Sequence, residues 1–287
     1  MSAGAFFAQH EVHVGQDVGG RALTVSETDV ARYEGGTGGA STRPAGAAPA
    51  LILHSEVYRS LAWYLPNIFG NLHARQEWEL FAPILVGQPI RTRSTVVDRY
   101  RYRKRNREYV VNEVVVTDDA GRWLQRSRTH QSFLVEDGRR ETVVDREREK
   151  RPERVFSVGE GPGEPIGPLT RPITIAMCEA FSGPEKNYHN DREMARMLGF
   201  PDIVVQGMLS VCLVSELMTG AFGAGWLFAG KMDVRLVNVV WVDDVLATRG
   251  KVREEVAESG HRRVHLDVWC EKADGTKALV GTASALR

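Results

Sequence analysis

Residues 185–189, with the sequence EKNYH, bring together the side chains of this chain that are best suited to proton transfer. They form an irregular segment before a short helix, which Asp191 is expected to cap. A carboxylate and an imidazole that hold one water between them can remove its proton and deliver a second proton to a substrate. The residue types and spacing therefore predict Glu185, Asn187 and His189 as catalytic residues. The alternative is that His189 makes only structural hydrogen bonds.

A second segment, Gln206-Gly207-Met208, begins an apolar helix. The free N–H groups of a helix's first turn point toward the preceding loop, where they can hold a carbonyl oxygen as it becomes an enolate. Gly207 has no side chain, so a ligand can approach the backbone closely there. We therefore predict Gln206, Gly207 and Met208 as oxyanion and substrate-binding residues. The alternative for Gly207 is tight packing of the helix on a sheet.

These segments must be positioned by a helix that is apolar on most sides and by long strands. The helix GMLSVCLVSELM, residues 207–218, needs cover nearly all round. The stretches VVNEVVVTDDAGRWL and VHLDVWCEKADGTKAL alternate with period two into an Asp/Gly turn, which indicates antiparallel hairpins with one solvated face. A curved antiparallel sheet wrapped round one central helix is the hot-dog architecture, in the α+β class.

The same order of elements occurs twice along the chain. LTVSETDVARYEGG, a helix around residues 50–65 and strands are followed later by PITIAMCEAFSG, a helix and strands. Tyr33-Glu34-Gly35 corresponds to Phe181-Ser182-Gly183, and residues 86–90 correspond to residues 242–246. We therefore predict a double hot-dog whose two sheets pair edge to edge, which covers strand edges that would otherwise be exposed.

The boundaries of the two halves follow from a charged run, DGRRETVVDREREKRPER. Its composition and its proline predict a solvated linker over residues 137–154, with a binding surface as the alternative. The predicted domains are an N-terminal hot-dog at residues 1–136 and a C-terminal hot-dog at residues 155–287. The glycine-rich loop of the first half, residues 35–49, has no acid, imidazole or amide side chain, so only the second half is expected to carry a site.

The overall charge argues against a nucleic-acid partner. The 287 residues include 37 basic and 37 acidic side chains, so no excess of cations is available to displace counterions from phosphates. The tyrosine- and arginine-rich run at residues 99–107 is interpreted as a solvated strand edge or a contact for the phosphates of a ligand. A hydrophobic fraction of 43% with 26% charged residues is typical of a soluble globular protein.

Three cysteines that are far apart in the sequence, Cys178, Cys212 and Cys270, fit neither a disulfide framework nor a zinc ribbon. The chain begins without an export signal, and polar residues interrupt its longest apolar stretch, so we predict a cytoplasmic protein without a membrane partner. Neither metal-ligand spacing nor a phosphate-binding loop in its usual strand-to-helix context is present. We therefore predict neither a metal nor a cofactor.

The motifs of the second half resemble a known family. The order G-x5-H, D-x3-A, GFP and QGM is similar to the MaoC-like (R)-specific enoyl-CoA hydratases and dehydratases, whose usual site reads S-G-D-x-N-P-I-H-x-D. HARQEWELFAPILVGQPI resembles the degenerate first half of the double hot-dog members. Without gaps, the family's acid falls on Pro184 and its amide on Lys186. One insertion and one deletion instead align Glu185 and Asn187 with them, and His189 keeps its place either way.

The resemblance implies a hydratase or dehydratase that acts on the α,β-bond of an acyl thioester, either acyl-CoA or acyl-carrier-bound. Glu185 would polarise the water, His189 would share it and move the second proton, and Asn187 would orient the pair. The first half would hold the acyl chain. A non-catalytic acyl-thioester-binding protein and a thioesterase are the alternatives, because one fold hosts several functions. We expect a homodimer.

Overall fold

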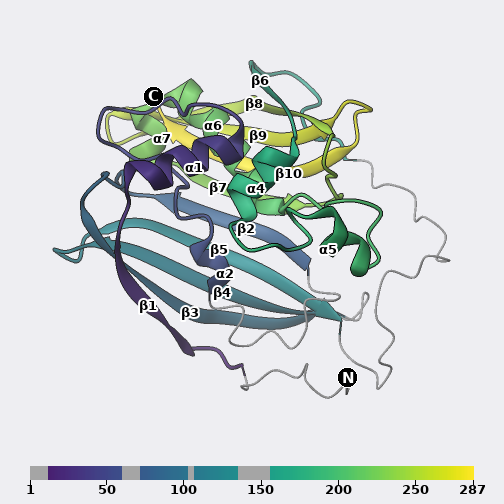
Figure 1. The fold of residues 1–287 in the computed structure, drawn as a ribbon. Coiled ribbons are helices and arrows are strands. Elements are labelled where there is room, and N and C mark those ends of the chain that lie inside the picture. Colours follow the sequence, from purple (N-terminus) through teal and green to yellow (C-terminus); the bar gives the residue numbers. More distant parts are fainter. Residues whose placement is uncertain (1–11, 60–71, 103–106, 135–155) are drawn as a thin grey trace.

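The computed structural model describes residues 12–59, 72–102, 107–134 and 156–287. Within these residues the strands form one antiparallel sheet in the order β1-β3-β4-β5-β2-β7-β10-β9-β8-β6 (Figure 1). The first-half strands are β1 (Asp17–Thr24), β2 (Leu72–Leu80), β3 (Pro89–Tyr102), β4 (Arg107–Asp118) and β5 (Trp123–Leu134). The second-half strands are β6 (Pro165–Pro172), β7 (Lys231–Leu236), β8 (Val245–Glu258), β9 (His261–Lys272) and β10 (Lys277–Leu286).

The strand order repeats itself about the centre of the sheet. Outward from the centre, the first half runs β2-β5-β4-β3-β1 and the second half runs β7-β10-β9-β8-β6. The halves meet where β2 pairs antiparallel with β7, with Glu77 opposite Asp233. The predicted double hot-dog with sheets paired edge to edge is therefore confirmed. The linker predicted at residues 137–154 lies outside the described residues, and the domain boundaries stay a prediction.

Equivalent turns make the same backbone hydrogen bonds in both halves. The N–H of Gly121 donates to Asp118 in the β4–β5 hairpin, and the N–H of Gly275 donates to Lys272 in the β9–β10 hairpin. The positive φ angles of 78° and 85° at these two glycines explain the residue type. The terminal hairpins that were predicted from period-two alternation therefore have one common turn.

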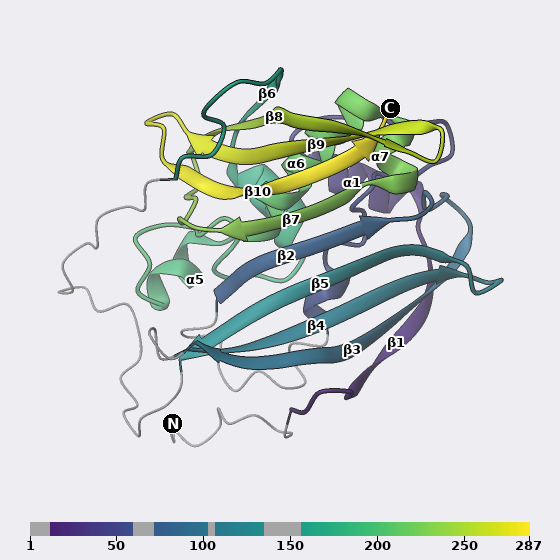
Figure 2. The same ribbon diagram turned by 180° about the vertical axis from the view of Figure 1, so that it is seen from behind.

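The helices lie on one face of the sheet, and the view from behind shows the other face bare of helices (Figures 1 and 2). They are α1 (Glu27–Thr37), α2 (Glu56–Arg59), α4 (Ile175–Ser182), α5 (Arg192–Met197), α6 (Gly207–Phe222) and α7 (Ala224–Ala229). Ser26 caps α1 and Thr174 caps α4, each through a side-chain oxygen that accepts a backbone N–H. Residues 33–35 and residues 181–183 therefore occupy equivalent positions, as predicted, because each triplet begins seven residues after the N-cap of its helix.

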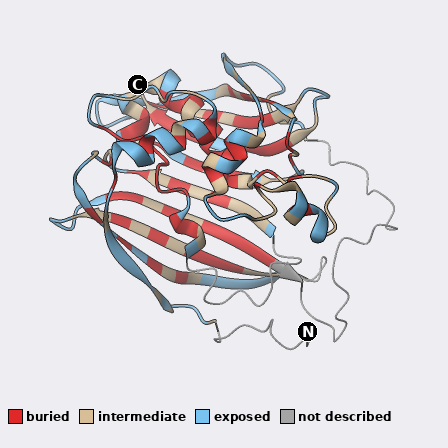
Figure 3. Ribbon diagram, in the orientation of Figure 1, coloured by how far each residue is buried: buried red, intermediate tan, exposed pale blue. Residues whose placement is uncertain are grey.

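The long helix α6 is the centre of the second half. Nearly all of its first thirteen residues are buried, and it contacts β6, β8, β9 and β10 (Figure 3). The helix predicted around residues 50–65 is wrong over its first part: residues 50–55 form hydrogen-bonded turns, and α2 begins only at Glu56. The N–H groups of Ile52, His54 and Tyr58 donate to carbonyls three residues earlier, which is turn geometry. Residues 60–65 lie outside the described part of the chain.

The outer face of the sheet carries ion pairs between neighbouring strands. Arg75 donates two hydrogen bonds to Asp233, both 2.6 Å long, across the junction of the halves. A groove of about 340 Å³ on this face is lined by charged side chains such as Glu77 and Arg253, and it includes none of the predicted site residues. None of the helices in the described residues is long and apolar enough to cross a membrane.

Candidate functional site

The loop that carries the predicted catalytic residues starts where α4 ends at Ser182. Gly183 follows in extended backbone and donates its N–H to the carbonyl of Glu179 at 2.9 Å. A Cβ atom at Gly183 would lie 2.5 Å from that same carbonyl oxygen, closer than real contacts allow. Glycine is therefore required for the chain to leave the helix at this point and enter the loop.

Asn187 holds the loop in shape through three hydrogen bonds. Its Nδ2 donates to the carbonyl oxygens of Ser182 and Glu185, each at 2.9 Å. Its Oδ1 accepts the backbone N–H of His189 at 2.9 Å. Asn190, which is buried, donates its Nδ2 to the same Glu185 carbonyl and accepts the N–H of Asn187. The Asn187 amide thus fixes the backbone that carries His189, and its orienting role in catalysis stays a prediction.

His189 has a fixed tautomer. Its Nδ1 lies 2.6 Å from the carbonyl oxygen of Val204, which can only accept, so the proton is on Nδ1 and the lone pair is on Nε2. Burial lowers the pKa of His189 to about 4, and the bond to Val204 opposes this effect. The imidazole is therefore neutral above about pH 4. The Tyr188 ring lies against it with a centroid distance of 3.9 Å.

Glu185 differs from His189 in its surroundings. Its side chain is exposed, whereas its carbonyl oxygen turns into the loop and accepts the two amide hydrogen bonds. Among the described residues, no ion pair or hydrogen bond joins its carboxylate to another side chain. The neighbouring Lys186 pairs instead with Asp191 at 2.9 Å. The Glu185 carboxylate is thus unpaired at the surface of the same loop, and its role stays a prediction.

The start of α6 faces this loop. Gln206 precedes the helix and makes no capping bond to it, and its Oε1 lies 3.5 Å from the Ser182 hydroxyl. Gly207 packs tightly on the sheet, since a Cβ there would lie 2.5 Å from Leu236 Cδ1, which supports the packing alternative. The side chain of Met208 is fully buried in the core. Gly207 and Met208 can therefore contribute to an oxyanion site only through their backbone N–H groups.

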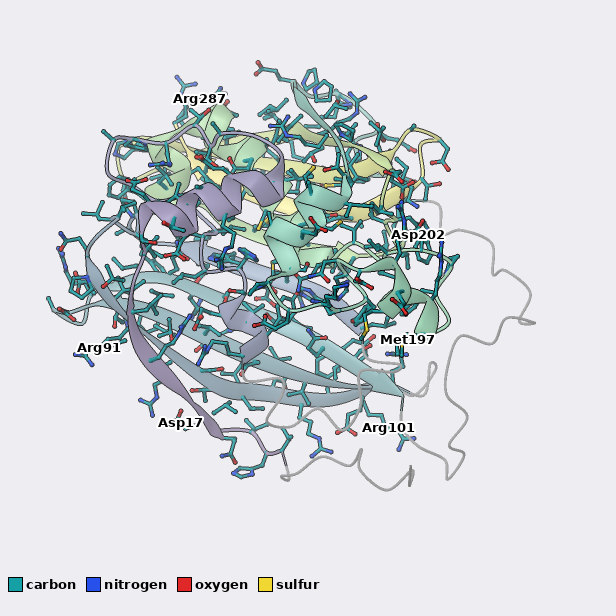
Figure 4. The ribbon with its side chains drawn as sticks, in the orientation of Figure 1. Asp17, Arg91, Arg101, Met197, Asp202 and Arg287 are labelled. Atoms are coloured by element: carbon teal, nitrogen blue, oxygen red, sulfur yellow. The ribbon has the colours of Figure 1, made fainter. Side chains whose placement is uncertain are left out.

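The predicted short helix is confirmed as α5. Asp191 caps it by accepting the N–H of Met194 at 2.9 Å, and Arg192 pairs with Asp202 at 3.0 Å in the turn that follows. In Figure 4, Met197 and Asp202 mark this helix and this turn. The N–H of Val204 then returns to the carbonyl of Tyr188 at 3.3 Å. The segment from α5 to α6 thereby closes on the loop and positions the Val204 carbonyl for His189.

The equivalent place in the first half is occupied by an arginine. Ala47 pairs with Leu85 as Val204 pairs with Trp241, so the Ala47 and Val204 carbonyls are counterparts. Arg43 Nη1 donates to the Ala47 carbonyl at 2.7 Å, as His189 Nδ1 donates to that of Val204. A guanidinium stays protonated in proteins and cannot act as a base. The expectation that only the second half carries a catalytic site stays a prediction.

Residues of the first half also reach the loop. The His54 ring stacks on Phe181 of α4 with a centroid distance of 4.1 Å. Burial raises the pKa of the Tyr58 phenol, and the nearby phenol of Tyr188 raises it further. Tyr58 in turn donates its hydroxyl to His73 Nδ1 at 2.9 Å, because His73 Nε2 faces the carbonyl oxygen of the Gln76 amide. The candidate site therefore lies where the two halves meet.

The sequence did not indicate every residue that shapes the site. The carbonyls of Ser182 and Val204 are invisible in it, because every residue has one. Asn190 could have been found, since a second asparagine three residues after Asn187 is suited to side-chain-to-backbone bonds. Among the described residues, no group of three or more His, Cys, Asp or Glu side chains is arranged to hold a metal ion.

Comparison with known proteins supports the fold over the whole chain and the family over its second half. Residues 143–269 match the model of the MaoC like domain. A MaoC-like dehydratase from Phytophthora capsici superposes with a TM-score of 0.71 at 15% identity, covering 95% of each chain. The full-length peroxisomal multifunctional enzyme type 2 of Drosophila melanogaster has a TM-score of 0.65 at 15% identity, covering 93% of this chain and 48% of that one.

A third solved structure has the same duplicated architecture. Rv0216, a conserved hypothetical protein of Mycobacterium tuberculosis described as having a double hotdog fold, gives a TM-score of 0.60 at 14% identity and covers 96% of both chains. No curated protein sequence matched the chain. Together with the ten-stranded sheet, these likenesses show that the chain has the double hot-dog fold and that its second half is similar to the MaoC like domain.

Proposed function

We propose that the protein adds water to, or removes it from, the α,β-bond of an acyl thioester. The observation that carries this proposal is His189: its Nδ1–H is held by the Val204 carbonyl, and its Nε2 therefore presents a lone pair in the loop beside the start of α6. A neutral imidazole with one fixed nitrogen is suited to proton transfer to and from water. The match of residues 143–269 to the MaoC like domain points to the same chemistry.

In the hydration direction, His189 Nε2 accepts a proton from water while the hydroxide oxygen forms a bond to Cβ. The electron pair of the α,β-bond moves to Cα and is delocalised onto the thioester oxygen as an enolate. The backbone N–H groups of Gly207 and Met208 stabilise that oxygen. The imidazolium then returns the proton to Cα, so that water has been added and the histidine is neutral again. Dehydration follows the same steps in reverse.

The other two predicted residues support His189 in different ways. Asn187 is a positioning residue, because its hydrogen bonds go to backbone atoms of the loop, including the His189 N–H. Glu185 is assigned to polarise the water, which its carboxylate can do only if it turns toward His189 when substrate binds. Its lack of a salt-bridge partner in the described residues leaves it able to do so.

The test measures hydration of crotonyl-CoA and longer enoyl-CoA thioesters through loss of the conjugated-thioester absorbance. His189→Ala should lower kcat by about a hundredfold or more, which is typical for a positioned acid or base. Glu185→Gln should produce a loss of similar size. His261→Ala and Glu193→Gln are the matched controls, because both residues are exposed and lie outside the loop.

Three outcomes would change the assignment. If hydration survives Glu185→Gln but not His189→Ala, then Glu185 is not the group that polarises water. Release of free coenzyme A from a saturated acyl-CoA, lost in His189→Ala, would replace hydration by thioester hydrolysis. Acyl-CoA binding without turnover of any thioester would make the chain a binding protein.

A further inference from the structure

The inner face of β5 in the first half is a column of polar side chains. Gln125, Ser127, Thr129 and Gln131 all point toward the helix side of the sheet, and each is at most 4% exposed. The residues between them point to the opposite, outer face of the sheet. There Arg126 forms an ion pair with Glu79, and Arg128 forms one with Glu113. We call these four residues the polar column. Amides and hydroxyls are unusual in an inner face, which normally packs apolar groups.

The second half has no such column at the equivalent positions. In β10 the positions equivalent to the polar column are Leu279, Gly281, Ala283 and Ala285. The register shows this, because their partners in β9 are equivalent to the partners of the polar column in β4. Leu279 and Ala285 are fully buried. There the sheet needs only to pack against the apolar helix α6. The same scaffold is thus stable with apolar residues, so packing alone does not explain the polar column.

Two amides of the polar column keep an unsatisfied carbonyl oxygen. Gln125 donates its Nε2 to the Ala50 carbonyl at 2.6 Å. Within the described part of the chain, the buried Oε1 atoms of Gln125 and Gln131 have no hydrogen-bond partner. By contrast, the Thr129 hydroxyl is satisfied by Gln76 Oε1 at 2.8 Å. A buried polar atom without a partner destabilises a fold. The buried Gln131 oxygen, which lies at the end of β5 opposite His73, therefore indicates a group that is kept for a ligand.

The polar column extends toward the catalytic loop. Gln131 lies directly opposite His73 of β2, which accepts the hydrogen bond from Tyr58. Tyr58 is near Tyr188, whose ring lies against that of His189. A chain of neighbouring side chains therefore connects the imidazole that is assigned to the chemistry with the column. When the thioester group lies at His189, the acyl chain can extend toward the polar column in the first half.

We propose that the acyl group of the substrate carries a hydroxyl, which the Gln131 side chain binds on the inner face of β5. This rests on the proposed function only in taking the ligand to be an acyl thioester. Carbonyl oxygens accept hydrogen bonds, so the group they bind must donate one, which a hydroxyl does and an ionised carboxylate does not. A plain hydrocarbon chain would leave the Gln131 oxygen unpaired and gains nothing from it.

The experiment compares hexenoyl-, octenoyl- and decenoyl-CoA, each with and without a terminal hydroxyl, in hydration assays. The corresponding saturated thioesters are compared in calorimetric binding. The wild type should prefer the hydroxylated member at one chain length at least. Gln131→Met, which keeps the length but not the polarity, should lower that preference by about threefold to tenfold, the effect of one neutral hydrogen bond. Gln131→Ala reproduces the residue of the second half and serves if the methionine variant does not fold.

Arg126→Met is the matched control, because it removes a polar group from the same strand but on the outer face. It should leave the preference unchanged. Gln131→Met should also raise the melting temperature of the ligand-free protein by a few degrees, because an unsatisfied buried oxygen is lost. A lower melting temperature together with an unchanged preference would show that the polar column is structural, and would overturn the inference.

The two proposals fail in different ways. Hydration of both members of every pair at equal rates would support the lyase and refute the bound hydroxyl. Tighter binding of hydroxylated saturated thioesters, without hydration of any enoyl-CoA, would support the bound hydroxyl and refute the lyase. Equal binding of both members of every saturated pair refutes the inference whatever the activity is.

Discussion

Removing the Asn187 side chain should disorder the loop of residues 183–190 without unfolding the protein. Asn187→Ala deletes three hydrogen bonds, two donated to the Ser182 and Glu185 carbonyls and one accepted from the His189 N–H. Each neutral hydrogen bond contributes about 0.5–1.5 kcal/mol net, and part of the loop is exposed to water that can replace the partners. We therefore expect the loop's ordered form to lose about 1–3 kcal/mol, which is roughly a fivefold to 150-fold change in its opening equilibrium.

Asn187→Asp separates the hydrogen bond that the Asn187 side chain accepts from the two that it donates. It keeps an oxygen that can accept the His189 N–H, but an ionised carboxylate places negative charge against two carbonyl oxygens. This arrangement should raise the pKa of the new carboxyl above its usual range. Below that pKa the protonated acid restores one donor, so loop order should be greatest at low pH and should fall as pH rises through the raised pKa.

The assay is amide hydrogen exchange of residues 183–190, followed by mass spectrometry, together with enoyl-CoA hydration. Asn187→Ala should speed exchange in this segment and leave exchange in β9 and β10 unchanged. Lys186→Ala is the matched control, because that side chain is exposed and forms an ion pair with Asp191 outside the Asn187 hydrogen bonds. Unchanged exchange at Tyr188 and His189 in Asn187→Ala would refute the reasoning, whatever the enzymatic activity is.

Other predictions concern burial and backbone space. Burial raises the pKa of Glu216, so the folded state binds the carboxyl proton more tightly than the unfolded state, and the free energy of unfolding should fall as pH rises above about 4.5. Glu216→Gln should remove this loss, since the glutamine oxygen can still accept the hydrogen bond from the Tyr33 hydroxyl. Denaturant titrations at several pH values measure the effect. Gly183→Ala should lower both the free energy of unfolding and the activity, because the new Cβ would clash with the Glu179 carbonyl oxygen. Gly220→Ala should raise the free energy of unfolding by about 0.5–1 kcal/mol, because alanine is the better helix former and its Cβ would meet open space in α6. All three cysteine thiols are buried with raised pKa values, so a thiol reagent should label them only after denaturation. If His189 is the base, hydration should be lost as pH falls through about 4, because protonation takes up the Nε2 lone pair; a pH–rate profile checks this.

The sequence predicted the elements whose signals are local. The hairpins were visible because alternation and an Asp/Gly turn are both short-range features, and the start of α5 because Asp191 is a good N-cap. The apolar run at residues 50–55 was misread as helix. Its backbone forms successive turns instead, and the buried Glu56 that follows them is held by Arg21 of β1, a partner 35 positions away that no local pattern reveals.

The candidate site shows a similar limit. Residue types indicated that Glu185, Asn187 and His189 could do chemistry, but not which atoms would be used. His189 is fixed by a backbone carbonyl 15 residues later, and Asn187 by carbonyls on both sides of it in the loop. Such partners depend on how the chain returns from α5 to α6. Only the three-dimensional path of the backbone brings them together.

The duplication separates what the fold supplies from what the side chains supply. Both halves bring a carbonyl acceptor to the same place, at Ala47 and at Val204, through the same strand-like bridge. In one half the donor is the guanidinium of Arg43, which keeps its proton and pairs with Glu34 at 3.6 Å. In the other half the donor is the imidazole of His189, whose second nitrogen is left with a lone pair. The capacity for proton transfer therefore follows from the side chain that uses this acceptor and not from the scaffold, because the scaffold is common to both halves.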